Sequence, residues 1–189
     1  MSETAPCRHA VFRVDASPQI GAGHVTRCLA LANSLARQGW RCTFASVSET
    51  WATAPQIERL PCNKYRLDAS AWRTPSALAE AAATGCDLLV IDHYGLAEDY
   101  ERPCRAWADS ILVIDDLADR PHDCDSLLDP ANDNGNRYDG LVPPGCRLLL
   151  GPNFALLASE FVQRREAALR MRGDFPVERV LIAFGATDP

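Results

Sequence analysis

The chain has 189 residues, a length that suits one domain and the beginning of a second. Apolar residues make up 47% and charged residues 23%, close to the averages of folded globular proteins, which excludes wholesale disorder and a fibrous architecture. The net charge is -6, and the 19 basic residues, all arginines except Lys64, are scattered, which excludes the basic footprint of a nucleic-acid-binding domain.

The sequence also bears on the compartment. No apolar run approaches the roughly 18 residues of a membrane-spanning helix, so we predict no membrane segment. The first nine residues contain Glu3, Arg8 and His9 and no apolar stretch, so we expect no secretory signal and a cytoplasmic protein. The eight cysteines form no C-x-x-C pair, which argues against a zinc or redox motif. We expect reduced thiols that pack in the interior.

The N-terminal part of the chain predicts a βαβ unit. Residues 10–15 are apolar and β-branched, residues 20–23 form a glycine-rich turn, and apolar residues recur at helical spacing over 25–38. Gly39 stands where a C′ glycine ends a helix, and residues 40–45 follow as a second strand. The buried stripe of the helix is expected to contain Val25, Leu29, Ala32 and Leu35.

Helices and apolar strands then alternate. Helices are predicted over 75–83 and near 99–108, and continuous apolar strands over 88–92 and 111–115. Strands that are apolar throughout are typical of sheets covered on both faces. The fold class is therefore α/β: a Rossmann-like, mostly parallel sheet with helices on both faces.

The last third of the chain is less regular. Residues 121–144 are rich in Pro, Asp, Asn and Gly and predict a long connection, with a short strand at residues 127–128. Another short strand is predicted over 147–150, and a helix near 159–171.

The C-terminal end predicts the start of another domain. Residues 179–184 have a strand pattern, and residues 185–189 form a strand-to-helix turn. A lone terminal strand is the alternative, but it would lack a crossover partner. We assign residues 1–175 to an N-terminal domain and residues 176–189 to the first strand and turn of a truncated second domain.

A glycine turn, Gly21-Ala22-Gly23, presents His24 at the start of the first helix. The glycines permit close backbone approach, and a helix N-terminus offers free N–H groups to an anion. The turn is not a dinucleotide fingerprint, because Thr26 replaces the expected small residue, and no Gly-Lys-Ser/Thr follows as in a Walker A loop. The missing fingerprint disfavours a dinucleotide-dependent oxidoreductase.

His24 lies in the first turn of the predicted helix, where the positive end of the dipole disfavours protonation. We therefore expect a neutral imidazole, which is a suitable general base near pH 7. The alternative is a capping or surface histidine that follows a tight turn. Ligands of open parallel sheets bind at the carboxyl ends of the strands, where this histidine is expected.

Two acidic motifs end apolar strands at the same expected edge. Asp92, His93 and Tyr94 can orient a substrate or a water, although Asp-x-x-Gly is also an ordinary turn. Asp115 and Asp116 are adjacent carboxylates, but no third ligand follows at a recognisable spacing. Turn initiation or helix capping is the stronger interpretation, and we predict no metal site.

Ordered blocks along the chain resemble one enzyme family. They are residues 12–17, 20–32, 91–95, 114–116, 138–143, 151–157, 160–161 and 184–189. In this order they resemble the UDP-2,4-diacetamido-2,4,6-trideoxy-β-L-altropyranose hydrolases of pseudaminic acid biosynthesis. Three positions depart from the family, which commonly has Tyr, Arg and Gly at Phe154, Ala158 and Ala186.

The resemblance implies the N-terminal half of a GT-B fold, in which two Rossmann-like domains face a cleft. It also implies a hydrolase that needs no metal or other cofactor. His24 would activate water for attack on the anomeric carbon, with departure of UDP and inversion. Substrate contacts are implied for Arg13, Asp15, Gly21, Gly23, Asp92, His93, Tyr94, Asn153 and Phe154.

The family holds the uridine and pyrophosphate chiefly in its second domain. The partners that we expect are therefore a UDP-sugar substrate and the missing C-terminal nucleotide-binding domain, in cis or in trans. Without this domain most substrate positioning is lost, so we expect little turnover by the isolated chain. The alternatives are a glycosyltransferase with the same fold and a non-catalytic sugar-binding half-module.

Overall fold

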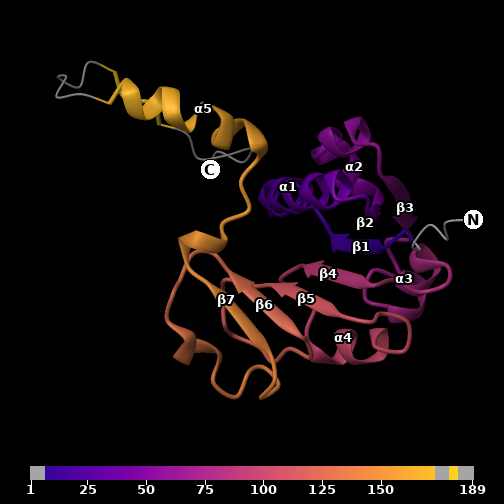
Figure 1. The fold of residues 1–189 in the computed structure, drawn as a ribbon. Helices are drawn as coiled ribbons and strands as arrows, with labels where there is room; N and C mark the ends of the chain where they lie inside the picture. The colour runs from indigo at the N-terminus through magenta and orange to yellow at the C-terminus, as the bar shows by residue number, and fades with distance from the viewer. Residues whose placement is uncertain (1–6, 173–178, 183–189) are drawn as a thin grey trace, which may run out of the picture.

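The computed structural model describes residues 7–172 and 179–182, which contain one seven-stranded sheet in the order β3-β2-β1-β4-β5-β6-β7 (Figure 1). Every neighbouring pair of strands is parallel. The strands are β1 (His9–Val14), β2 (Arg41–Val47), β3 (Asn63–Leu67), β4 (Leu88–Asp92), β5 (Ile111–Ile114), β6 (Ser126–Asp129) and β7 (Arg147–Leu150). The predicted Rossmann-like α/β fold is confirmed.

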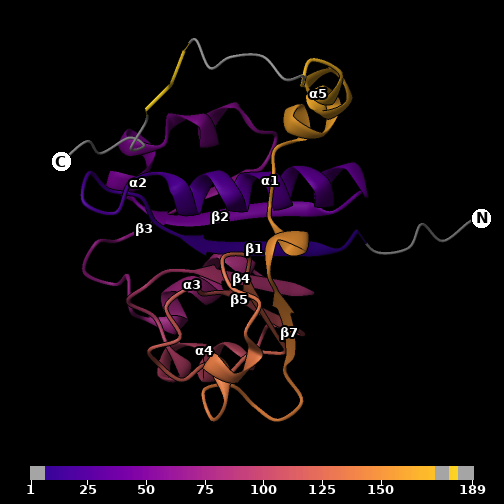
Figure 2. The same cartoon turned by 90° about the vertical axis from the view of Figure 1, so that its left-hand side faces the viewer.

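Helices cover both faces of the sheet. The α-helices are α1 (Gly23–Arg37), α2 (Ser48–Thr53), α3 (Pro75–Ala82), α4 (Glu98–Cys104) and α5 (Ser159–Arg170). Short 3-10 turns are η1 (Pro55–Arg59), η2 (Gly135–Tyr138) and η3 (Pro152–Phe154). Figure 2 shows α1 and α2 on one face of the sheet, and α3 and α4 on the other.

The core consists of two apolar layers, one on each face. Side chains alternate along a strand, so β1 sends Val11 into the layer under α3 and α4, and Phe12 into the layer under α1. Phe12 stacks on Phe44 of β2, with ring centroids 4.8 Å apart. Burial on both faces explains why the central strands are apolar throughout.

Helix α1 ends as its sequence predicts. Gly39 has φ of +85°, which favours glycine, and follows the last helical turn. Its N–H donates to the Ala36 carbonyl at 3.0 Å, and the Trp40 N–H donates to the Leu35 carbonyl at 3.1 Å. This pair of bonds is a Schellman motif, which turns the chain directly into β2.

The structure departs from the expected elements in four places. Helix α4 ends at Cys104, before the predicted end near residue 108, with Pro103 in its last turn. Strand β3 and helix α2 were not predicted. Residues 179–182 have no regular secondary structure, while residues 183–189 of the predicted strand and turn lie outside the described residues. The proposed domain boundary stays a prediction.

Helix α5 extends away from the body of the fold (Figures 1 and 2). It buries none of its residues, and its exposed apolar side chains include Phe161 and Val162. Below it, the α1 face of the sheet is incompletely covered, because Leu112 of β5 and Leu149 of β7 are only partly buried. In the part of the chain that is described, no helix is both long and apolar enough to cross a membrane.

The two-sided core makes a stability prediction. Leu89 of β4 is fully buried in the layer under α3 and α4, so Leu89→Ala should lower the free energy of unfolding by about 2–5 kcal/mol. Leu157→Ala is the matched control, because 59% of that side chain is exposed and the expected change is within about 0.5 kcal/mol. Urea unfolding measures both variants, and equal losses would contradict the packing described here.

Candidate active site

The candidate site lies where β1 and β4 end. These strands are parallel neighbours, so the turn after β1 and the turn after β4 meet at the carboxyl edge of the sheet. The first turn leads into α1 and places His24 in its first helical turn. The second follows Asp92, the last residue of β4, and contains His93 and Tyr94. Residues 68 positions apart in the chain therefore come into contact.

His24 and Asp92 form a buried pair. The His24 Nδ1 atom lies 2.8 Å from the Asp92 Oδ1 atom, and the exposed fractions of the two residues are 6% and 0%. An ionised carboxylate only accepts hydrogen bonds, so Nδ1 carries the proton. Nε2 contacts no hydrogen-bonding group among the described residues and stays available to a ligand or a water.

The pair shifts the pKa of both partners. Burial favours the neutral imidazole, but the hydrogen bond and charge of Asp92 outweigh it and raise the pKa of His24 above 6.5. Burial likewise opposes ionisation of Asp92, but hydrogen bonds from Arg27 and His24 lower its pKa. The expectation that the helix dipole disfavours protonation of His24 is wrong in direction, because the Asp92 carboxylate in direct contact raises the pKa.

Arg27 clamps the same carboxylate. Its Nε and Nη2 atoms each donate to a different oxygen of Asp92 at 2.6 Å, and its Nη1 atom lies 3.3 Å from Asp116 Oδ2. Such a bidentate pair fixes the carboxylate plane as well as its charge. Sequence reasoning missed Arg27, although its position three residues after His24 puts both side chains on one face of α1.

Tyr94 borders the open side of His24. The two rings meet edge to face, with centroids 4.5 Å apart, and Tyr94 is 41% exposed. Burial and the nearby Asp116 carboxylate raise the pKa of Tyr94, so its phenol stays protonated at neutral pH. It can therefore donate a hydrogen bond to a ligand beside His24.

His93, Asp15 and Arg13 form a second hydrogen-bonded cluster. The His93 Nδ1 atom accepts the Gly95 N–H at 2.9 Å, so Nε2 carries the proton and faces Asp15 Oδ2 at 3.4 Å. Arg13 Nη2 donates to the same oxygen at 2.8 Å. Burial opposes ionisation of Asp15, but the hydrogen bonds from His93 and Arg13 outweigh it and lower its pKa.

Arg13 and Asp15 lie beneath the surface of this site. Arg13 is fully buried, and Asp15 also accepts the Val47 N–H at 3.0 Å and the Thr50 hydroxyl at 3.3 Å. Arg13 holds the Asp15 carboxylate in place, and this carboxylate fixes the orientation of the His93 ring through its contact with Nε2. Next to His93 is a cavity of about 350 Å³. It is lined by Asp15, Ala16, Ser17, Ile20, Val47, Glu49, Ala69, Trp72 and His93.

The two predicted turn glycines, Gly21 and Gly23, have different structural roles. Gly21 has φ of +73° and donates its N–H to the Ser17 carbonyl at 2.8 Å, which closes the turn before α1. Gly23 has no such backbone requirement, and a Cβ built on it would meet nothing within 4 Å. Its missing side chain leaves open space at the N-terminus of α1.

Asn153 and Phe154 are not brought to this cluster. Both lie in η3, directly after β7, at the carboxyl edge of the same sheet. Three strand spacings, roughly 14 Å, separate β7 from β4. Both residues are exposed, with Phe154 at 40%. They share the rim with His24 but contact none of the other predicted site residues through the interactions found in the described part of the chain.

The adjacent acids after β5 have separate partners. Asp115 is fully buried, with its carboxylate and carbonyl oxygen near the Tyr138 hydroxyl, whereas Asp116 faces Arg27. Among the described residues, no group of three or more His, Cys, Asp or Glu side chains is arranged to hold a metal ion. Capping of the turn by the Asp115 carboxylate, which accepts the Ala118 N–H at 2.8 Å, agrees with the interpretation as a turn residue.

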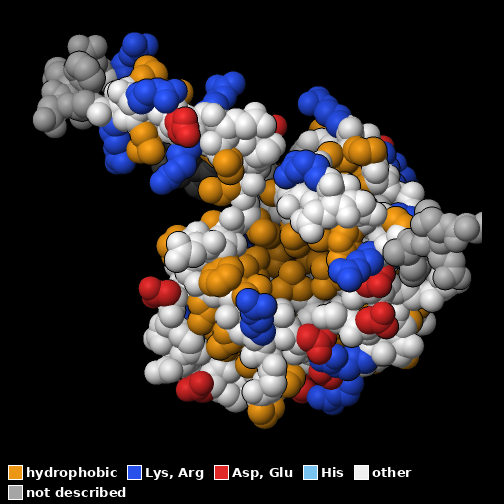
Figure 3. Space-filling view, viewed as in Figure 1, with side chains coloured by type: hydrophobic (Ala, Val, Ile, Leu, Met, Phe, Trp, Pro, Cys, Tyr) orange, Lys and Arg blue, Asp and Glu red, His pale blue; other side chains and the backbone are white. Residues whose placement is uncertain are grey.

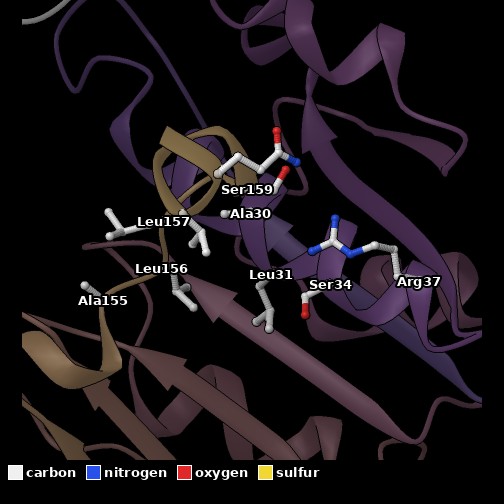
Figure 4. A pocket seen from close by; sticks show the side chains of 10 residues that line it. Ala30, Leu31, Ser34, Arg37, Ala155, Leu156, Leu157 and Ser159 are labelled. Carbon is white, nitrogen blue, oxygen red and sulfur yellow. The ribbon is translucent and has the colours of Figure 1, made fainter. Parts of the chain in front are cut away.

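A larger cavity, of about 540 Å³, lies elsewhere, between α1 and the segment after β7 (Figure 4). Leu31, Leu156 and Leu157 contribute apolar walls, and Arg37 is its only charged residue. Because its lining contains no histidine or carboxylate, we assign no chemistry to it.

The His24–Asp92 pair predicts a distinctive titration. Among the four histidines, the pKa of His24 should lie above 6.5, whereas burial and Arg41 hold the pKa of His9 below it. Since folding raises the pKa of His24, this pair stabilises the fold below about pH 6.5, and the contribution is lost as the pH rises through the folded pKa. NMR titration of the imidazole carbons measures both values.

The Asp92→Asn variant tests whether the Asp92 carboxylate is the cause of the raised pKa of His24. Removing the carboxylate charge should lower the pKa of His24 and leave that of His9, at the opposite end of β1, unchanged. An unchanged His24 pKa in this variant would contradict the proposed pairing.

The chain is similar to a curated protein over most of its length. No protein-family model matches the chain. The chain is 33% identical over 181 residues to the UDP-2,4-diacetamido-2,4,6-trideoxy-β-L-altropyranose hydrolase of Campylobacter jejuni subsp. jejuni. The match covers 94% of this chain and 60% of the relative, so the chain spans less than two thirds of the relative's length. The resemblance seen in the sequence blocks is confirmed.

Proposed function

We propose that this chain carries the catalytic base of a nucleotide-sugar hydrolase. The substrate would be UDP-2,4-diacetamido-2,4,6-trideoxy-β-L-altropyranose, and the reaction would belong to pseudaminic acid biosynthesis. Similarity to the C. jejuni hydrolase over 94% of the chain supports this choice of reaction. The observation that carries the proposal is the contact of His24 Nδ1 with Asp92, which leaves Nε2 for a water at the edge of the sheet.

In the proposed reaction, Nε2 of His24 takes a proton from a water molecule. The water oxygen attacks the anomeric carbon while the bond from this carbon to the oxygen of UDP breaks, so that UDP leaves and the configuration inverts. Asp92 holds the Nδ1 proton and stabilises the imidazolium as it forms. Arg27 keeps Asp92 ionised and fixed in its plane.

The glycine turn suits the phosphate end of the substrate. The N-terminus of α1 carries unpaired N–H groups and a partial positive charge, which favour an anion. The open space at Gly23 lets a phosphate approach this backbone closely. A diphosphate bound there would place its sugar near His24, which is the next residue.

The sugar is proposed to lie between Tyr94 and the cavity beside His93. Tyr94 offers a phenolic O–H next to His24, and Trp72 packs against His93 with ring centroids 5.0 Å apart. Apolar and aromatic walls with a few polar groups suit a deoxysugar with amide substituents. Asn153 and Phe154 are proposed to contact the substrate from the far side of the rim.

The partner of this domain is proposed to be a nucleotide-binding domain that corresponds to the part of the relative beyond the match. Together the two would make the GT-B arrangement, in cis or in trans. Figure 3 shows apolar side chains gathered in a hollow over the middle of the sheet, beside α1. Leu31, Leu112 and Leu149, partly buried on this face, would be covered by the missing domain.

The mechanism predicts a large loss of rate when the base or its partner is changed. In an active protein that contains this chain and the missing domain, His24→Gln and Asp92→Asn should each lower kcat for UDP release by about 10²–10⁴-fold. His9→Gln is the matched control, because His9 contacts Thr43 at the amino end of β1, away from the site.

Circular dichroism and the free energy of unfolding of each variant separate a lost base from a lost fold. A stably folded His24→Gln protein with the wild-type rate would remove the proposed base.

We propose that the catalytic base lies on this chain and that a further domain binds the nucleotide. The 189-residue chain should therefore release little UDP by itself. Addition of the missing domain should restore release of UDP and free sugar, because binding and positioning of the nucleotide then return. Both products are measured in the absence of a sugar acceptor. Hydrolysis gives UDP and free sugar under these conditions, whereas an obligate glycosyltransferase gives neither product. No turnover, even with the missing domain and an acceptor, would favour a sugar-binding half-module.

A further inference from the structure

Two cysteines meet at the amino ends of β6 and β7, on the edge of the sheet opposite the candidate active site. Cys124 precedes β6 by two residues, Cys146 directly precedes β7, and their Sγ atoms lie 3.6 Å apart. Both are free thiols, and no other two cysteines of the described residues share a hydrogen bond. Neither the resemblance nor the proposed hydrolysis gives this pair a role.

The backbone around the pair suits a disulfide bond. The two strands are parallel neighbours, and the Arg147 N–H donates to the Asp125 carbonyl at 2.9 Å. Continued by one residue, the register of these strands places Cys146 opposite Asp125, so Cys124 is its diagonal neighbour. A strand spacing of about 4.8 Å and a rise of about 3.3 Å per residue give a diagonal of about 5.8 Å, within the range of about 4.4–6.8 Å between the Cα atoms of disulfide-bonded residues. A side-chain rotation that brings the sulfur atoms about 1.6 Å closer would reach the bonding distance of about 2.0 Å.

We propose that Cys124 and Cys146 form a reactive dithiol, which a small-molecule disulfide such as oxidised glutathione converts into an intramolecular disulfide bond across β6 and β7. The site thus takes a low-molecular-weight disulfide as its co-substrate. It is a modification site, separate from the carboxyl-edge cluster around His24.

The burial and the neighbours of the two cysteines indicate which thiol reacts first. Cys124 is 1% exposed and Cys146 is only partly buried, so Cys146 is the thiol that an external disulfide reaches. The hydrogen bond from Cys124 lowers the pKa of Cys146, against the effects of burial and Asp125, and the nearby Arg105 adds to the lowering. The same hydrogen bond, together with burial, raises the pKa of Cys124.

The proposed reaction proceeds by two exchanges. The Cys146 thiolate attacks one sulfur of oxidised glutathione, breaks its S–S bond and expels one glutathione thiolate. Cys124 then loses its proton to solvent and attacks the Cys146 sulfur, which expels the second glutathione thiolate. The two protein thiols are oxidised by two electrons, and one glutathione disulfide is reduced to two glutathione thiols.

A bond here would close a segment that supports the rim of the site. The two cysteines are 22 residues apart, and Arg137 and Tyr138 lie between them. Arg137 donates to the Asp116 carbonyl at 3.2 Å, and the Tyr138 hydroxyl donates to the Asp115 carbonyl at 3.0 Å. The disulfide would therefore tether the loops that follow β5 without touching His24.

Peptide mapping tests the proposal on this chain. The folded protein is incubated with oxidised glutathione, remaining thiols are alkylated, and trypsin is added. Trypsin cleaves after Arg105, Arg137 and Arg147 but not before Pro121, so Cys124 is the only cysteine of peptide 106–137 and Cys146 the only cysteine of peptide 138–147. The expected product is these two peptides joined by a disulfide, which dithiothreitol separates.

Single variants test the order. Cys124→Ser should stop at one glutathione on Cys146, because no second thiol resolves it, whereas Cys146→Ser should leave Cys124 unmodified because it is buried. The exposed Cys7 serves as the internal control for reaction with glutathione. Modification of Cys7 in the wild type, without any linkage between Cys124 and Cys146, would overturn the proposal and needs no variant.

Discussion

The buried carboxylate of Asp92 is the interaction on which the candidate site depends. It accepts hydrogen bonds from His24 and from two nitrogen atoms of Arg27 while being fully excluded from solvent. A buried anion is costly unless it is paired, and here two cationic or proton-donating partners from one helix supply the pairing. The same contacts dock α1 onto the end of β4 and aim the imidazole outward. Stability and proposed chemistry therefore rest on one carboxylate.

The parallel sheet explains why these groups meet. In a parallel sheet all carboxyl ends share one edge, so the turns after β1, β4 and β5 bring His24, Asp92 and Asp116 together although they are far apart in the chain. The first two turns also form the second hydrogen-bonded cluster, in which Asp15 holds His93. The opposite edge carries the Cys124–Cys146 contact, so the two proposed chemistries do not share residues.

Sequence patterns predicted the helices and strands in which buried apolar residues are continuous or recur at a fixed spacing. The apolar runs of β1, β4 and β5 and the helical spacing of α1 have simple periods, and Gly39 marks the helix end. Strand β3, with exposed polar residues at the edge of the sheet, has no such period and was missed. Within the site, His24 and Asp92 were both singled out, but not as partners. Side-chain pairing over long separations, as between Arg27 and Asp92 or between Cys124 and Cys146, leaves no local pattern.

Isotope labelling tests the central claim, attack of water on the anomeric carbon, most directly. The UDP-linked altropyranose is incubated in H₂¹⁸O with an active protein that combines this chain with the proposed second domain. The masses of both products are measured by mass spectrometry at early times. The account predicts ¹⁸O on the anomeric hydroxyl of the sugar and none in UDP. Label in the β-phosphate of UDP would mean attack at phosphorus, and would contradict the mechanism.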